Sequence, residues 1–260
     1  MAGVLGVVVI MLFLHDTPQS KGLPGVEEMA GEAPQNAKHE STSGLQKMVL
    51  KTPAVWILAA ASAFMYIARY AINGWGVLFL QEEKGFSMTE ATTIISINAL
   101  LGILGTVLSG WVSDKLFRSD RYIPALIFGV MNSVALILFM FGGDSWFMNI
   151  TAMVLFGISI GVLICFLGGL MAVDIVPRQA TGAALGVVGA ASYVAAGIQD
   201  VASGWLIDGR SVISYTYNAT TGLFDKDIQY DFTPVAIFWI VASVISFLLP
   251  VLNWKYRKNR

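Results

Sequence analysis

Six apolar stretches, each long enough to cross a bilayer, dominate what this chain of 260 residues can fold into. A helix of about 20 apolar residues covers the roughly 30 Å of hydrocarbon in a membrane and pairs its own backbone polar groups there. The stretches comprise residues 54–80, 91–112, 122–141, 147–173, 181–207 and 233–253. We therefore expect an all-α, polytopic membrane helix bundle with six complete transmembrane helices.

The composition agrees with a membrane protein and disfavours other classes. Hydrophobic residues make up 56% of the chain and charged residues 13%, against about 25% charged residues in ordinary soluble domains. The single cysteine, Cys165, lies inside an apolar stretch, so we expect no disulfide framework, no metal site and no cofactor. No apolar stretch contains a histidine, a pair of carboxylates or a Gly-x-Ser-x-Gly motif, which argues against a membrane enzyme. We also expect no nucleic-acid partner.

The remaining segments divide the chain into further parts. Residues 1–14 are apolar but short for a complete span, and no Lys or Arg precedes residue 21, as a signal peptide would require. We expect residues 1–14 to be the end of a helix that begins upstream. Residues 15–53, rich in Gly, Pro, Glu and Ser, should form a cytoplasmic and poorly ordered linker. A six-helix unit over 54–254 and a basic tail over 255–260 complete the expected organisation.

The distribution of cations predicts the orientation of the bundle. Segments on one side of the predicted membrane carry twelve Lys and Arg residues, the other side carries three, and Arg69 within a span completes the sixteen. Because short cytoplasmic loops are enriched in Lys and Arg, the rich side should be cytoplasmic. The linker and the C-terminus belong to that side.

Two charges lie inside the predicted spans, and both are candidate functional residues. Arg69 is near the middle of its span, where an arginine costs roughly 2.5–3.5 kcal/mol on insertion scales. It should face a cavity and bind an anion. Asp200 has several possible roles: contact with substrate hydroxyls, coupling to a proton, or a gating pair. A structural pair between Arg69 and Asp200 is the alternative without a direct function.

The segment after the second span resembles the signature loop of the major facilitator superfamily. A glycine on the helix is followed by an aspartate at the membrane edge and then by basic residues; the residues concerned are Gly110, Asp114, Lys115, Arg118 and Arg121. Asp114 could accept hydrogen bonds from a helix N-terminus or an arginine and so latch one conformation of a rocking bundle. An ordinary cytoplasmic turn remains the alternative.

Three more stretches resemble one branch of that superfamily, the organophosphate:phosphate antiporters. The branch includes glycerol-phosphate and hexose-phosphate carriers and a sugar-phosphate sensor. The stretches are Asp16–Pro24, Tyr66–Trp75 and Asp174–Gly186, the last followed by Tyr193. They match, in order, the segment after the sixth helix, the seventh helix, and the junction of the tenth and eleventh helices. The resemblance therefore implies the C-terminal half of a twelve-helix carrier.

The resemblance also implies roles for individual residues. Arg69 matches the phosphate-binding arginine of the seventh helix, and a guanidinium can bind a phosphoryl group through two parallel hydrogen bonds. Tyr66 and Asn73 lie three and four positions away on the same helix face, as candidate partners for phosphate or sugar. Tyr193 and Asp200 complete the expected substrate-binding set.

Other positions concern conformational change or depart from the branch. Asp174 and Arg178, at the tenth-to-eleventh junction, are expected to act with the signature loop in gating. Some members carry charged residues just after the Pro-x-x-x-x-Gly element, where this chain has Leu185 and Val188. Some also carry a glutamate where this chain has Ala99. These departures affect the expected sugar specificity and leave the phosphate prediction unchanged.

Together these features predict transport of a phosphorylated small molecule in exchange for inorganic phosphate, by alternating access in a bacterial inner membrane. A phosphomonoester carries up to about two negative charges near neutral pH, so Arg69 alone leaves it under-neutralised. The resemblance places a second arginine and a histidine in the N-terminal six-helix half, which we expect as the partner. A membrane sensor for sugar phosphates and a homodimer of six-helix chains are the alternatives.

Overall fold

The computed structural model describes residues 6, 11, 22–24, 42–118, 120–218 and 223–258. The chain divides into two compact units, residues 1–42 and 43–260. Most of the predicted helix end at 1–14 and most of the predicted linker lie outside the described residues.

Six long helices confirm the predicted spans. They are α4 (Pro53–Glu82), α5 (Met88–Trp111), α6 (Tyr122–Phe141), α7 (Trp146–Cys165), α9 (Thr181–Asp208) and α10 (Thr233–Leu248). Their starts follow local chemistry, because a proline occupies the first turn of α4 and of α10, where its missing N–H leaves no bond unmade. Ser87 and Glu90 form a reciprocal capping box at the start of α5.

Several spans extend beyond the α-helix through turns of other helical types. The π-helical turn η2 (Val112–Leu116) extends α5, and η3 (Phe166–Leu170) joins α7 to the short α8 (Met171–Ile175). The 3-10 turn η4 (Arg178–Ala180) precedes α9, and η5 (Leu249–Lys258) follows α10. The signature segment therefore begins inside a helix, and Asp114 belongs to the turn η2 instead of a loop.

Two further elements were not predicted from the sequence. The helix α3 (Thr42–Lys51) occupies the last part of the predicted linker, where Leu45, Met48 and Val49 follow helical spacing and pack on the core. A two-stranded antiparallel hairpin, β1 (Val212–Asn218) and β2 (Leu223–Gln229), connects α9 to α10. The spanning part of the unit remains entirely helical.

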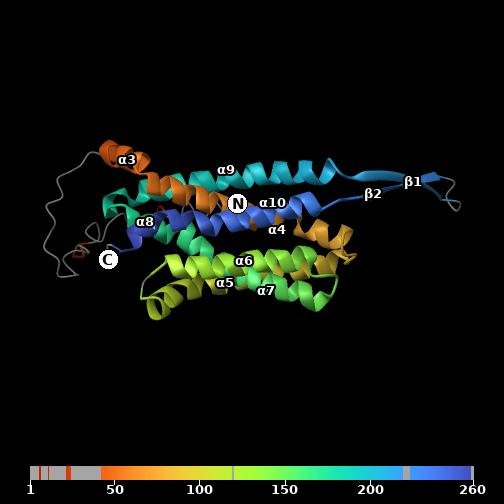
Figure 1. The fold of residues 1–260 in the computed structure, drawn as a ribbon, viewed down its shortest axis with the longest axis horizontal. Coiled ribbons are helices and arrows are strands. Elements are labelled where there is room, and N and C mark those ends of the chain that lie inside the picture. The colour runs from red at the N-terminus through yellow and green to blue at the C-terminus, as the bar shows by residue number, and fades with distance from the viewer. Residues whose placement is uncertain are drawn as a thin grey trace. The chain divides into compact units, whose positions relative to one another are not determined.

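The helices pack in a pattern that repeats after three spans. In Figure 1 α5, α6 and α7 lie side by side, and α4 contacts α9, α10 and α5. The first three spans, α4, α5 and α6, correspond in order to the last three, α7, α9 and α10. Exchanging each helix for its counterpart turns the α4–α9 contact into the α7–α5 contact, and both of these contacts are extensive. The same exchange converts the α4–α10 contact into the α7–α6 contact. Such a relation is expected of two inverted three-helix repeats.

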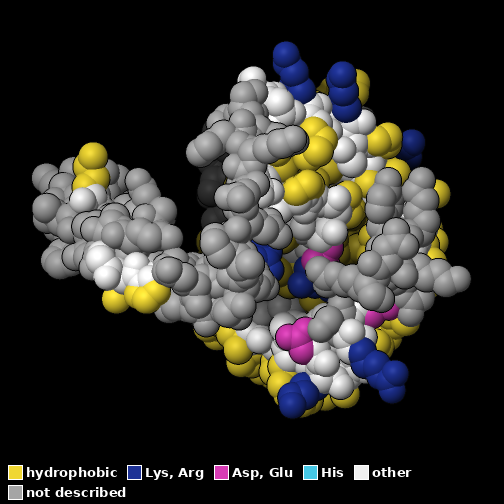
Figure 2. All heavy atoms as spheres, turned by 90° about the vertical axis from the view of Figure 1, so that its left-hand side faces the viewer, with side chains coloured by type: hydrophobic (Ala, Val, Ile, Leu, Met, Phe, Trp, Pro, Cys, Tyr) yellow, Lys and Arg dark blue, Asp and Glu magenta, His cyan; other side chains and the backbone are white. Residues whose placement is uncertain are grey.

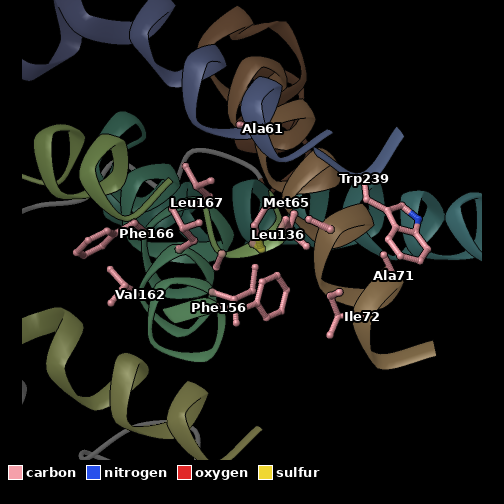
Figure 3. Close-up of a cluster of buried hydrophobic side chains, with 14 of the residues drawn as sticks. Ala61, Met65, Ala71, Ile72, Leu136, Phe156, Val162, Phe166, Leu167 and Trp239 are labelled. Atoms are coloured by element: carbon pink, nitrogen blue, oxygen red, sulfur yellow. The ribbon is translucent and has the colours of Figure 1, made fainter. Parts of the chain in front are cut away.

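The core of the unit is apolar and closely packed. Met65 of α4, Leu136 of α6 and Phe156 of α7 are fully buried in one cluster, which also includes Trp239 of α10 (Figure 3). In water, full burial of a side chain of this size stabilises a fold by about 1.5–3 kcal/mol. In a bilayer the lipid tails are equally apolar, so these side chains stabilise the bundle through close packing.

Two of the spanning helices leave much of their apolar surface uncovered. In α5 and α9 only 28% of the most apolar stretch is buried, against 44–61% in the other four spans. The exposed side chains are large, and they include Val107 on α5 and Trp205 on α9. Under the three-span exchange α5 corresponds to α9, so the uncovered faces are related by the same repeat.

The two ends of the bundle differ in character. The α5–α6 connection and the α8–α9 turn form one end, which we name the basic end, and lysine and arginine side chains stand around its rim (Figure 2). The hairpin β1–β2 extends from the other end, the hairpin end (Figure 1).

Candidate functional site

Arg69 lies midway along α4, half-buried, with its guanidinium beside two tyrosine rings of the same helix. Its guanidinium carbon is 5.5 Å from the ring centroid of Tyr66 and 5.7 Å from that of Tyr70. The two rings stack with their centroids 5.8 Å apart. Because a cation over an aromatic face is attracted by the ring quadrupole, the rings help to fix the guanidinium. Tyr70 was not predicted as a site residue, although its position four residues after Tyr66 is the signal that could have indicated it.

Tyr193 of α9 joins this cluster. Its ring meets the Tyr66 ring edge-on with 5.5 Å between centroids, and 64% of the residue is exposed. The neighbouring Ser192 shares a buried hydrogen bond of 2.8 Å with Ser62 of α4, which fixes the two helices at this height. The structure thus brings together the predicted residues Arg69, Tyr66 and Tyr193.

Asn73 lies one turn further along α4, on the Arg69 face and exposed. Its side-chain oxygen lies 3.5 Å from Nδ2 of Asn98 on α5, which donates more closely to the carbonyl of Ile95 at 2.6 Å. Asn98 is 4% exposed and was not predicted as a site residue.

Asp200 is exposed on α9 and packs against α4 at a glycine. A Cβ atom added at Gly74 would lie 3.3 Å from Oδ1 of Asp200. The ion pairs among the described residues do not join Asp200 to Arg69, so the structural alternative for these two charges is not formed here. The structure therefore places Asp200 near the Asn73 level and leaves its role a prediction.

The residue before Asp200 has a structural role that the sequence did not reveal. The fully buried Gln199 donates through Nε2 to Oγ of Ser203 at 2.9 Å, and Nε1 of Trp239 donates to the same hydroxyl at 2.9 Å. These bonds connect α9 to α10. Oε1 of Gln199 is buried without a partner among the described residues.

A hollow of about 610 Å³ runs along the exposed face of α9. Its lining is almost wholly apolar, and Tyr193 is the one predicted site residue that it contains. An apolar groove of this kind suits a helix or an acyl chain and not a phosphate, so the Arg69 face and the hollow are different surfaces.

Two of the predicted gating residues form a close contact at the basic end. Nη1 of Arg121 donates to Oδ2 of Asp174 at 2.6 Å and to the carbonyl oxygen of Leu170 at 2.6 Å. Since Arg121 precedes α6 and Asp174 belongs to α8, the pair ties the α5–α6 connection to the end of the fourth span. A charge-assisted bond of this length is among the stronger hydrogen bonds in proteins.

The other predicted gating residues belong to the neighbouring turns and helix ends. Asp114, Lys115, Arg118 and Arg178 are exposed at the basic end, and Arg118 has a left-handed backbone with φ 52°. No atom would lie within 4 Å of a Cβ added at Gly110, so close packing does not explain this glycine within the described residues. Gating roles for all these residues stay predictions.

The geometry around Arg69 is suited to an anion. A guanidinium with aromatic neighbours keeps its charge and its five donors, and no described carboxylate pairs with it. The described residues contain no group of His, Cys, Asp and Glu side chains that could hold a metal.

The fold and this face define a polytopic helical membrane protein with a half-buried, mid-span arginine between two incompletely covered helices. Residues 1–199 match the profile of the Major Facilitator Superfamily. The chain therefore belongs to this superfamily.

Curated relatives narrow the comparison. The chain is 36% identical to the "Glycerol-3-phosphate transporter" of Bacillus subtilis (strain 168), over 71% of this chain and 43% of the relative. It is 33% identical to the "Membrane sensor protein UhpC" of Escherichia coli (strain K12), over 78% of this chain and 48% of the relative. Identity to the "Probable hexose phosphate transport protein" of Chlamydia pneumoniae is 31%, over 73% and 45% respectively. The chain spans less than half the length of these relatives, and they fit the organophosphate:phosphate antiporter branch that the motifs predicted.

Proposed function

We propose that this chain supplies the C-terminal half of a carrier that exchanges a phosphorylated small molecule for inorganic phosphate by alternating access. The observation that carries the proposal is the position of Arg69, mid-span and beside the rings of Tyr66 and Tyr70, with no ion-pair partner among the carboxylates that the structure describes. Two parallel donors of the guanidinium match two oxygens of a phosphoryl group. The names of the relatives, which include carriers for glycerol 3-phosphate and hexose phosphate, support this ligand class.

The partner in this proposal is a second six-helix half. One pair of unit charges at 4 Å is worth about 4 kcal/mol at an effective dielectric constant of 20, so a doubly charged phosphate needs another cation in a partly dry site. The Arg69 face of α4 lies between α9, contacted through Tyr66 and Tyr193, and α5, contacted through Asn73 and Asn98. Those two helices have the largest uncovered apolar faces. A second half covering α5 and α9 would enclose Arg69 and add the missing cation.

The basic end is the cytoplasmic end in this proposal, and the membrane is a bacterial inner membrane. The Arg121–Asp174 pair would then latch the cytoplasmic end in the conformation described, and opening toward the cytoplasm would break it.

A sensor that binds the same ligand without moving it is the second candidate. It is favoured by the 33% identity to the "Membrane sensor protein UhpC" of E. coli. Both candidates use Arg69 in the same way, and they differ in whether binding is followed by exchange.

Exchange of 32P-labelled phosphate tests the proposal. The protein is produced from its native genomic context, so that any second half is co-expressed, and is reconstituted into phosphate-loaded liposomes. We expect rapid exchange by the wild type and none by Arg69→Lys, because an ammonium lacks the planar pair of donors. Arg210→Lys is the control, since Arg210 is exposed at the hairpin end and its ion pair with Asp231 is long at 3.8 Å. Normal exchange by Arg69→Lys would overturn the assignment, and phosphate binding without exchange by the wild type would favour the sensor.

A further inference from the structure

A second polar level lies nearer the hairpin end than Arg69. Asp200 of α9 packs there against Gly74 of α4, and the neighbouring Asn73, on the Arg69 face of α4, has its side-chain oxygen 3.5 Å from Nδ2 of Asn98 on α5. We propose that this level binds the hydroxylated end of the substrate and disfavours organophosphates whose far end is acidic. The inference rests on the proposed function, since it assumes that Arg69 holds the phosphate.

The contacts between α4 and α9 place this level relative to Arg69. Ser62 meets Ser192, Tyr66 meets Tyr193 and Gly74 meets Asp200, so the contacts advance along both helices in the same direction. Gly74 follows Arg69 by five residues, a distance of about 7.5 Å along a helix. A short polyol phosphate can bridge such a distance from its phosphate to its far hydroxyl. Asp200 also lies eight residues before the end of α9, about 12 Å along the helix.

Gly74 gives Asp200 its position. The carboxylate lies where even a methyl side chain at residue 74 would be in tight contact, 3.3 Å from Oδ1. Asp200 therefore reaches the α4 backbone and is exposed, and it lies seven residues after Tyr193 on the same face of α9. A negative charge at this place is unhelpful to an anion carrier unless it selects among anions.

Asp200 and Asn73 are both exposed, and their side chains recognise hydroxyl groups and not a second anion. A carboxylate only accepts hydrogen bonds, whereas a primary amide offers both two donors and an acceptor. A substrate hydroxyl can donate to Asp200 and accept from the amide of Asn73. A carboxylate on the substrate can do neither with Asp200, and the two negative charges repel each other across a partly dry space. Specificity would thus come from a repulsive element as well as an attractive one.

A competition experiment tests the inference with two probes that differ at one end. Binding of 32P-labelled phosphate to the purified protein is displaced either by glycerol 3-phosphate or by 3-phosphoglycerate. In the wild type we expect glycerol 3-phosphate to compete better by about tenfold or more, as a differential interaction of 1.4 kcal/mol would give. In Asp200→Asn this ratio should fall close to one, mainly because 3-phosphoglycerate improves, and the affinity for phosphate itself should rise slightly as a negative charge is removed.

A second variant moves the carboxylate without removing it. Gly74→Ala should lower the ratio in the same direction, because its methyl group displaces Oδ1 of Asp200. Gly189→Ala on α9 is the matched control, since no atom lies within 4 Å of a Cβ there, and it should keep the wild-type ratio. An unchanged ratio in Asp200→Asn, or a wild type that prefers 3-phosphoglycerate, would overturn the inference. Failure of the proposed function looks different: the wild type would then not bind phosphate, or Arg69→Lys would bind it equally well.

Discussion

Arg69 is distinctive because, among the described residues, its charge lies beside two aromatic rings and not beside a carboxylate. An ion pair would have neutralised the guanidinium within the chain, whereas Tyr66 and Tyr70 orient it and leave its positive charge available. This arrangement suits a residue that must bind and release an anion repeatedly.

The ring of Tyr70 should contribute to anion binding through Arg69. Replacing Tyr70 with Leu removes one of the two rings beside the guanidinium, and we expect phosphate to bind more weakly by about 0.5–2 kcal/mol, or roughly 2–30-fold. Tyr70→Phe keeps the ring and should remain within about twofold of the wild type. Equilibrium phosphate binding measures both, and equal loss in the two variants would assign the effect to the hydroxyl instead.

Single residues of the site were predictable to different degrees. Arg69 is evident because a charge inside an apolar stretch is expensive and needs a reason. Tyr70 and Asn98 were missed because neither carries a charge and their closeness to Arg69 and Asn73 is evident only in the structure. The Gly74–Asp200 contact depends on how α4 and α9 are aligned, which periodicity along one helix does not specify.

At the scale of elements, small residues determine how closely α5 and α7 pack. A Cβ at Gly161 would overlap the carbonyl oxygen of Gly102 and lie 2.9 Å from the backbone nitrogen of Thr106. Backbone cannot give way as a flexible side chain can. The crossing therefore requires a glycine.

We expect Gly161→Ala to separate the two helices and lower stability by about 1–3 kcal/mol, as overpacking does. Its control is Gly186→Ala on α9, where no atom lies within 4 Å of the added methyl group. That control should be neutral or stabilised by up to about 1 kcal/mol, because alanine favours the helix. Thermal unfolding in detergent compares them, and an unaffected Gly161→Ala would contradict the described crossing.

Lys84 connects two turns at the hairpin end. Its ammonium donates to the carbonyl oxygens of Phe139 and Gly143 and to Oδ1 of Asn149, the last two at 2.9 and 2.8 Å. Burial lowers the pKa of Lys84 to about 8, against the opposing effect of Asp144 and Glu83. The α4–α5 turn is thereby joined to the end of α6 and the start of α7.

The lowered pKa gives stability a specific pH dependence. An unfolded lysine has a pKa of about 10.4, so between about pH 8 and pH 10 the unfolded chain holds more protons and the free energy of unfolding rises with pH. Lys84→Met should be less stable than the wild type by about 1–3 kcal/mol, because three acceptors lose their donor. The difference in stability between the wild type and Lys84→Met, measured by thermal unfolding, should increase from pH 8 to pH 10. The exposed Lys51→Met is the control, and a gap that narrows with pH would contradict the effect of burial.

The six membrane-spanning helices were predictable from the sequence, whereas the π-helical turns and the hairpin were not predicted. Apolar runs of 20 or more residues have one solution in a bilayer, so existence and order followed from the sequence. The turns η2 and η3 were missed because a π-helical turn changes the hydrogen bonds without changing the hydropathy. The hairpin had a usable signal, since Ile213, Tyr215 and Tyr217 alternate with the polar residues Ser214, Thr216 and Asn218. That signal lay in a segment interpreted only as a loop.

At the scale of the whole molecule, the repeat, the uncovered faces and the site belong to one arrangement. The three-span exchange relates α5 to α9, and the Arg69 face of α4 lies between them. These features together support an unfinished anion site at the edge of one half of a carrier.

Equilibrium binding of inorganic phosphate is the decisive measurement for Arg69, because the carrier and the sensor both require it. The measurement uses 32P-labelled phosphate and protein purified from its native genomic context, as wild type, Arg69→Lys and the control Arg210→Lys. We expect saturable binding by the wild type and by Arg210→Lys, and binding weaker by about 100-fold or more in Arg69→Lys, which corresponds to the loss of a charge-assisted pair of hydrogen bonds. Equal affinity in Arg69→Lys and the wild type would contradict the assignment of Arg69 as the phosphate ligand.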